Sequence, residues 1–120
     1  MKNYPEHYNQ ILALMQEVGH DLPSTMSAFG RLHRAGVSPG ELSPQTKELI
    51  ALAIAVVLRC DSCVAFHVHD TLKAGASHGA IMEALSVAIM MGGGPAVMYA
   101  CEALAALKQF EEEKKIKIPA

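Results

Sequence analysis

The sequence contains no tryptophan, and only 5% of its 120 residues are aromatic. It also lacks an excess of basic residues, because the formal net charge is -2 and the isoelectric point is near 6.3. Proteins that bind nucleic acid usually carry a basic patch or stripe, so we expect no nucleic-acid partner. Hydrophobic residues nevertheless make up 51% of the chain, and most are small or aliphatic. This composition is typical of closely packed helices.

No apolar run is long enough to cross a membrane. The longest one, Leu49–Leu58 (LIALAIAVVL), is far shorter than the roughly 20 residues that a membrane-spanning helix needs. At the amino terminus, MKNYPEHYNQ has neither the apolar core nor the small-residue cleavage site of a signal peptide. We therefore expect a cytoplasmic protein with no membrane partner.

Cysteine is also scarce, with only three residues in the chain. A domain of this size buries enough surface to fold without disulfides, and the cytoplasm is reducing. A close cysteine pair is then more often redox-active or metal-binding than a permanent crosslink. Two of the cysteines lie in the segment Arg59–Asp70 (RCDSCVAFHVHD), which also contains two histidines.

Helical patterns cover nearly the whole chain, and no segment alternates polar and apolar residues as a strand would. Serine caps and first-turn prolines mark helix starts, and glycines mark ends. The sequence predicts one all-α domain, residues 1–120, with about six helices. The expected ranges are Pro5–Val18, Pro23–Ala35, Pro44–Leu58, a helix from the CDSC break to Ala74, one from Ser77 to the glycines at 92–94, and one from Pro95 into the charged tail.

Two of these helices are apolar on nearly all sides. They contain Leu49–Leu58 and Ile81–Met91, and one subunit has little polar surface with which to cover both. Apolar helix faces that remain after folding often form subunit contacts. We therefore expect a homo-oligomer.

The cysteine-containing segment can assemble a reactive thiol. If Cys60 begins a helix, Cys63 and His67 lie on the same helix face. A helix amino terminus favours the thiolate, and a histidine one turn later can accept the thiol proton or stabilise the anion. Cysteines at this spacing can also form a disulfide with each other where the turn geometry permits. Nucleophile, base and resolving thiol are thus all available.

A structural or metal-binding role for the same residues is the alternative. Structural zinc needs four ligands, and Cys60, Cys63 and His67 provide three. The remaining cysteine, Cys101, lies in the apolar run VMYACEALAAL, where we expect it to be a buried small hydrophobic residue. We therefore expect no metal.

Four other histidines and the glycine run receive no catalytic assignment. His20, His33 and His78 fall near helix ends, where capping or solvent contact is the ordinary role. His69 follows His67 by two residues, so it should point to another face and lie at a surface or interface. The run 92–94 predicts a tight bend between closely packed helices, since it lacks the lysine and hydroxyl of a phosphate-binding loop.

The segment ELIALAIAVVLRCDSCVAFHVHDTLKAGAS resembles the core of the AhpD-like alkylhydroperoxidases, within the carboxymuconolactone decarboxylase superfamily. The shared pattern is Glu48, twelve residues before Cys60, followed by CxxCxxxH at Cys60, Cys63 and His67. The resemblance covers most of residues 42–107. It implies an all-helical subunit with a central helical hairpin, assembled into trimers or hexamers.

The resemblance also implies a mechanism without a cofactor. Cys63 would attack the hydroperoxide and become a sulfenic acid, which Cys60 would resolve to a disulfide. Glu48 would hold the imidazole of His67, which would draw the proton from Cys63. An external dithiol, either a lipoylated or a thioredoxin-like protein, would reduce the disulfide again.

One position departs from the pattern, because Ser62 stands where such proteins often carry a histidine. A second proton-shuttling imidazole is therefore missing, which is consistent with either a weak peroxidase or a thiol–disulfide protein. A non-catalytic redox sensor or metal-binding oligomer is the alternative. Lactone decarboxylation is less favoured, since that branch of the superfamily typically lacks the cysteine pair.

Overall fold

The computed structural model describes the backbone of residues 1–117 and the side chains of residues 1–114. Over that range it contains six α-helices and no β-strand. The helices are α1 (Tyr4–Asp21), α2 (Pro23–Val37), α3 (Pro44–Val57), α4 (Asp61–Lys73), α5 (His78–Gly92) and α6 (Gly94–Lys117). The expected all-α class is confirmed.

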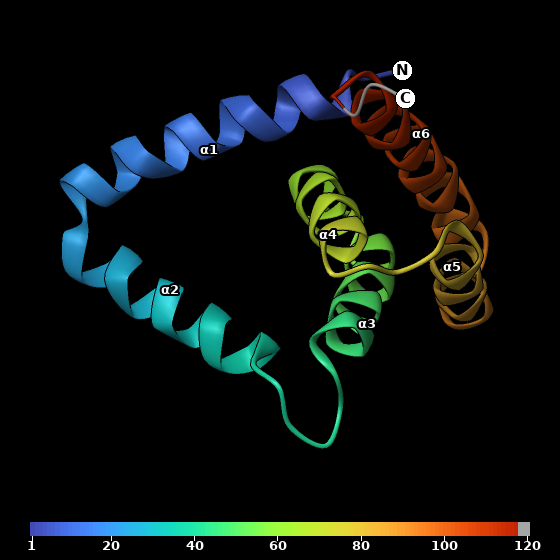
Figure 1. Cartoon of the computed structure of the whole chain (residues 1–120), viewed down its shortest axis with the longest axis horizontal. Coiled ribbons are helices and arrows are strands. Elements are labelled where there is room, and N and C mark those ends of the chain that lie inside the picture. The colour runs from blue at the N-terminus through green and yellow to red at the C-terminus, as the bar shows by residue number, and fades with distance from the viewer. Residues whose placement is uncertain (118–120) are drawn as a thin grey trace.

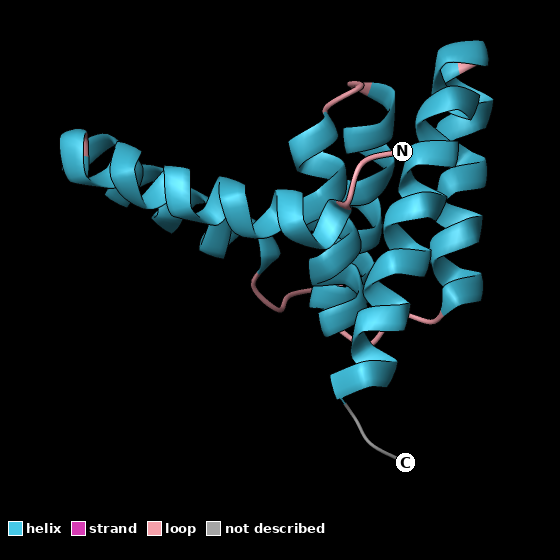
Figure 2. Ribbon diagram, turned by 90° about the horizontal axis from the view of Figure 1, so that it is seen from above, coloured by secondary structure: helices cyan, strands magenta, loops and turns pink. Residues whose placement is uncertain are grey.

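Helices α3 and α4 form a hairpin at the centre of the molecule (Figure 1). Helices α5 and α6 pack on one side of this hairpin, and α1 and α2 lie on its other side. The pair α1 and α2 projects from the four-helix body, and we call it the α1–α2 arm (Figure 2). The arm contacts the body mainly through α1, which packs on α4 and α6.

Aliphatic side chains from four helices fill the core. The largest fully buried aliphatic side chains come from all four helices of the body. They are Leu52 and Val56 of α3, Val64 and Val68 of α4, Ile81 and Leu85 of α5, and Leu107 of α6. Burying each such side chain is worth about 1.5–3 kcal/mol, so this core accounts for much of the driving force of folding. On α6 the inward positions are mostly alanines, and their small side chains let neighbouring helices approach closely.

Prolines, rather than glycines, end the first two helices. We expected α1 to end at Gly19 and α2 at Gly36, but both helices continue past these residues. Leu22 precedes Pro23 and leaves the helical region (φ -126°, ψ 62°), and Ser38 precedes Pro39 with ψ 152°. The ring of a proline disfavours helical geometry in the residue before it, which explains both ends.

The bend between α5 and α6 requires glycine at two positions. Gly93 has a φ of 68°, in the left-handed region that disfavours other residues. A Cβ on Gly92 would lie 2.7 Å from the Cβ of Ala96, closer than real side chains approach. The predicted tight bend is therefore confirmed.

The apolar helices α3 and α5 are buried on one side only within a single subunit. Ile50, Ile54 and Val57 of α3 are 40% to 52% exposed, and Met90 and Met91 of α5 are more than 70% exposed. Within one subunit, both helices therefore keep an uncovered apolar face. None of the helices in the described range has both the length and the apolar character that crossing a bilayer requires.

Candidate active site

The turn between α3 and α4 positions the first cysteine at a helix start. Arg59 adopts a φ of 56°, and the amide of Cys60 donates to the carbonyl of Ala55 at 3.2 Å. A left-handed residue with this bonding pattern closes a helix carboxyl end and reverses the chain at once. Cys60 then becomes the N-cap of α4, so this helix takes in Asp61, Ser62 and Cys63 of the expected CDSC break.

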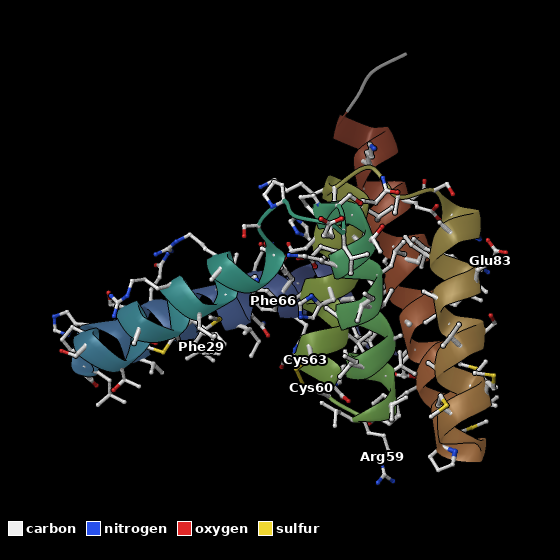
Figure 3. All side chains as sticks on the ribbon, turned by 90° about the horizontal axis from the view of Figure 1, so that it is seen from below. Phe29, Arg59, Cys60, Cys63, Phe66 and Glu83 are labelled. Atoms are coloured by element: carbon white, nitrogen blue, oxygen red, sulfur yellow. A yellow bond between two sulfur atoms is a disulfide. The ribbon has the colours of Figure 1, made fainter. Side chains whose placement is uncertain are left out.

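The two cysteines of the segment are joined in a disulfide. Their Cα atoms lie 5.2 Å apart, and the amide of Cys63 donates to Cys60 Sγ at 3.2 Å. Both residues are half-buried and lie on the side of the body toward the arm, which carries Phe29 (Figure 3). A disulfide sulfur is not a thiolate, so neither cysteine can serve as a zinc ligand in this state.

An acid from the neighbouring helix holds the histidine that follows the cysteines. Glu48 of α3 is only 5% exposed, and its Oε2 lies 3.0 Å from Nδ1 of His67. Thr71 reinforces the contact, because its single hydroxyl hydrogen lies within reach of the backbone carbonyls of both Glu48 and His67. An imidazole that donates from Nδ1 to a carboxylate carries its lone pair on Nε2, which is then the proton-accepting atom.

The site opens on a cavity of about 430 Å³ between the arm and α4. Its apolar lining comes from Tyr8, Ile11, Met15, Phe29 and Phe66. Its polar lining comes from His33, Arg34, Ser62, Cys63, His67 and Asp70. Cys63 and His67 therefore face the same space, as the one-face spacing predicted, and that space suits a largely apolar molecule with one polar end.

His33 belongs to this cavity, although its position near a helix end gave no sign of a function. Its ring centroid lies 6.4 Å from that of His67. One ligand atom each from His33, Glu48 and Asp70 lies within 4.8 Å of the others. The signal in the sequence was its spacing four residues after Phe29, which places both on the face of α2 toward the cavity.

His69 does not line the cavity and stays partly exposed, as expected for a residue on another helix face, and its ring stacks on Tyr8 with 4.2 Å between centroids and bonds to Asp70. The expectation for Cys101 is wrong. Cys101 is exposed, although its apolar neighbourhood suggested burial. Its neighbours Ala100 and Ala103 occupy the inward face of α6, and the helical period turns Cys101 outward.

The amino-terminal residues contact the start of α4. Lys2 pairs with Asp61, and this bond lowers the pKa of the Asp61 carboxyl. Tyr99 of α6 also donates to Asp61, which raises the pKa of the Tyr99 phenol. Nε2 of His7 lies 3.1 Å from the Ser62 hydroxyl, between the two cysteines of the turn. His7 was not predicted from the sequence.

Tyr4 fixes this amino-terminal segment to α6. Its ring is fully buried, its hydroxyl donates to Glu102 Oε1 at 2.6 Å, and its amide donates to the Gln109 side chain at 2.6 Å. Burial, followed by the bond to Glu102, raises the pKa of the Tyr4 phenol. The start of α1 is therefore held against the body rather than free.

A family model places the chain among known proteins. The model of the carboxymuconolactone decarboxylase family matches residues 23–106, which is most of the chain. The chain belongs to the carboxymuconolactone decarboxylase family. Its match includes α2 to α5 and the whole of the cysteine-containing segment. The predicted resemblance is confirmed at the level of this family.

Solved structures agree with the assignment. A carboxymuconolactone decarboxylase family protein from Legionella pneumophila is 36% identical, with a TM-score of 0.87 over 89% of this chain and 96% of that one. A family member from Thermotoga maritima is 31% identical, with a TM-score of 0.74 over 86% of this chain and 94% of that one. An involvement of the Thermotoga protein in the antioxidative response has been suggested.

Sequence relatives extend the family but name no activity. An uncharacterized protein from Cupriavidus necator is 44% identical over 73% of this chain and 78% of its own length. An uncharacterized protein of the cox locus of Paracoccus denitrificans is 36% identical over 75% of this chain and 94% of its own length. The names of these relatives therefore give no activity, and support for one comes from the chain's own site.

Proposed function

We propose that this carboxymuconolactone decarboxylase family protein is an AhpD-like thiol peroxidase that reduces organic hydroperoxides. The observation that supports this most strongly is the Cys60–Cys63 disulfide beside the Glu48–His67 pair, with Cys63 and His67 lining one cavity. Thiol, base and the acid that orients the base are the parts that nucleophilic catalysis requires. The apolar walls of the cavity favour an organic hydroperoxide over hydrogen peroxide.

The reaction begins with the reduced pair. Nε2 of His67 accepts the proton of Cys63, and the thiolate attacks the terminal oxygen of the hydroperoxide. The O–O bond breaks, the organic group leaves as an alcohol with the proton from His67, and Cys63 becomes a sulfenic acid. Cys63 is thereby oxidised, and the hydroperoxide is reduced by two electrons.

Resolution and reduction complete the cycle. The Cys60 thiol attacks the sulfur of the Cys63 sulfenic acid, a disulfide forms, and water leaves with the thiol proton. Two thiols of an external dithiol protein, lipoylated or thioredoxin-like, then exchange with the disulfide and restore both cysteines. This requirement for a dithiol partner fits a cytoplasmic location.

The test is hydroperoxide consumption by the reduced protein. With excess dithiothreitol and cumene hydroperoxide, we expect steady turnover by the wild type and none by Cys63→Ser. Cys60→Ser, reduced and then freed of dithiothreitol, should consume one equivalent and then stop, because its sulfenic acid has no resolving thiol. The matched control is Cys101→Ser, which changes an exposed cysteine outside the site and should keep wild-type turnover. Undiminished turnover by Cys63→Ser would reject the proposal.

One observation favours a second function, which is binding of a divalent cation. The ligand atoms of His33, Glu48 and Asp70 converge within 4.8 Å, and imidazole with carboxylates suits zinc or manganese. Metal analysis of the purified protein decides between the two functions. About one metal ion per subunit that is lost in Asp70→Asn, together with no hydroperoxide turnover, would support cation binding instead.

A further inference from the structure

A second imidazole reaches the cysteine turn from a distant part of the chain. Ser62 lies between Cys60 and Cys63, and its hydroxyl is bonded to Nε2 of His7 at 3.1 Å. His7 lies on α1, 55 residues earlier, and is half-buried where α1 packs on α4. The bond therefore links the arm to the two sulfur-bearing residues on either side of Ser62.

The position of His7 is set by its own helix. Tyr4, one turn earlier, is fully buried and bonded to α6 through both its hydroxyl and its amide. The ring of His7 meets the ring of Tyr4 edge-on, with 6.5 Å between centroids. An imidazole held this way keeps its bond to Ser62 without the freedom of an exposed side chain.

The state of His7 decides what the Ser62 hydroxyl can do. A hydroxyl has one hydrogen to donate. In neutral His7 with its proton on Nδ1, Ser62 donates to Nε2 and has no hydrogen left for another group. In protonated His7 both ring nitrogens carry a proton, so Nε2 donates to the Ser62 oxygen, and the hydroxyl hydrogen is free for a thiolate in the same turn. Hydrogen bonds to a thiolate stabilise it, so thiol reactivity follows the protonation of His7.

We propose that His7 is a positioning residue of the cysteine pair, which acts through Ser62 and makes the reactivity of the reduced thiols depend on its own protonation. The inference rests on the proposed thiol function and adds a pH control to it. It also supplies an imidazole from α1 at the turn where the sequence has serine.

Charged and titratable groups of α4, α6 and the amino terminus lie near His7. Asp61 of α4 is close enough for a charge on His7 to contribute, after the bonds from Lys2 and Tyr99, to the lowered pKa of that carboxyl. Lys2 and Tyr99 also bond to the Asp61 carboxylate, so less of its negative charge acts on His7. Tyr4 and its partner Glu102 complete the set on α1 and α6.

The test is the pH dependence of alkylation of the reduced protein by iodoacetamide, with each cysteine followed by mass spectrometry. We expect the alkylation rate of the wild type to include a pH dependence that comes from His7. His7→Gln keeps a hydrogen-bonding side chain but cannot titrate, so this inflection should be lost while the contribution of His67 remains, and the rate at pH 6 should fall about tenfold, the effect of one pKa unit on the thiolate fraction. Ser62→Ala should give the same profile although His7 remains.

Two further variants make the result specific. His20→Gln changes an exposed histidine at the far end of α1 and should keep the wild-type profile. Ser62→His in the His7→Gln background should restore the inflection, because an imidazole then stands in the turn itself. Coincident profiles for wild type, His7→Gln and Ser62→Ala would overturn the inference. Alkylation needs no hydroperoxide, so it tests the role of His7 separately from the peroxidase. If the alkylation profile depends on His7 but the protein does not consume hydroperoxide, this inference stands and the proposed peroxidase is rejected.

Discussion

At the scale of single residues, Glu48 is the buried acid of the candidate site. Its carboxylate is 5% exposed, and a buried carboxylate without a partner would cost several kcal/mol. The bond from Nδ1 of His67 offsets that cost and orients the ring, so that Nε2 is the atom available to accept a proton. Loss of this acid should therefore affect chemistry more than shape, provided its volume is kept.

Glu48→Gln tests this role, because it preserves size but removes charge. We expect the rate of hydroperoxide reduction to fall about tenfold to a hundredfold, toward the lower end of what a general base contributes. Glu83→Gln is the matched control, since Glu83 is exposed on α5 and points away from the body (Figure 3). Equal rates for wild type and Glu48→Gln in a stopped-flow assay would show that the acid does not assist the thiol.

The Lys2–Asp61 pair should make a pH-dependent contribution to the stability of the fold. Lys2 lowers the pKa of Asp61 below its ordinary value of 3.8, so the ionised carboxyl stabilises the folded state. That stability is present above about pH 4 and is lost as the pH falls through the lowered folded-state pKa. Urea unfolding of Asp61→Asn should show a deficit of at most about 1 kcal/mol at pH 7, because the pair is partly exposed. The deficit should shrink as the pH falls through the lowered folded-state pKa, and a deficit that stays constant into acid would contradict this origin.

At the scale of helices, the bend between α5 and α6 allows the two helices to pack closely. Gly92→Ala would place a Cβ 2.7 Å from that of Ala96, so we expect a loss of about 1–3 kcal/mol in the free energy of unfolding. Gly36→Ala is the matched control, because a Cβ on this helical glycine meets nothing within 4 Å. That change should be neutral or stabilise by up to about 1 kcal/mol. Urea titrations of both variants would reveal an error if Gly92→Ala proved as stable as Gly36→Ala.

Local chemistry explains which helix boundaries could be predicted. Ser43 before Pro44 and Ser77 before α5 both cap as expected, since a cap depends only on neighbouring residues. The ends of α1 and α2 could not be assigned to Gly19 and Gly36, because glycine permits a helix to end but does not force it. Pro23 and Pro39, by contrast, disfavour helical geometry in the residue before them and so end the helices there.

The site was predictable only where it lies within one helix. Spacing alone placed Cys60, Cys63 and His67 on one face of α4. Glu48 could have been solvated or buried, and only its register in the family pattern favoured a role. His7 and His33 reach the site from α1 and α2, and such contacts between helices depend on packing that a single sequence does not state.

At the scale of the whole molecule, apolar surface remains on α3 and α5. Ile54 is 52% exposed and Met90 is 73% exposed, and soluble monomers rarely leave many such side chains together. We expect a homo-oligomer, a trimer or hexamer, with a mass in solution that is a multiple of 12.8 kDa. Ile54→Glu should shift the light-scattering mass toward one subunit, whereas the exposed polar change Glu17→Gln should not. A wild-type protein that is monomeric at micromolar concentration would contradict this expectation.

In the proposed reaction, Cys60 and Cys63 together reduce a hydroperoxide by two electrons. The first measurement to make is the intact mass of the reduced protein after one equivalent of cumene hydroperoxide, with the peptide spanning both cysteines sequenced. We expect the loss of two hydrogens and a Cys60–Cys63 crosslink, formed in step with hydroperoxide loss. Unchanged thiols and unconsumed hydroperoxide would contradict the proposed reaction.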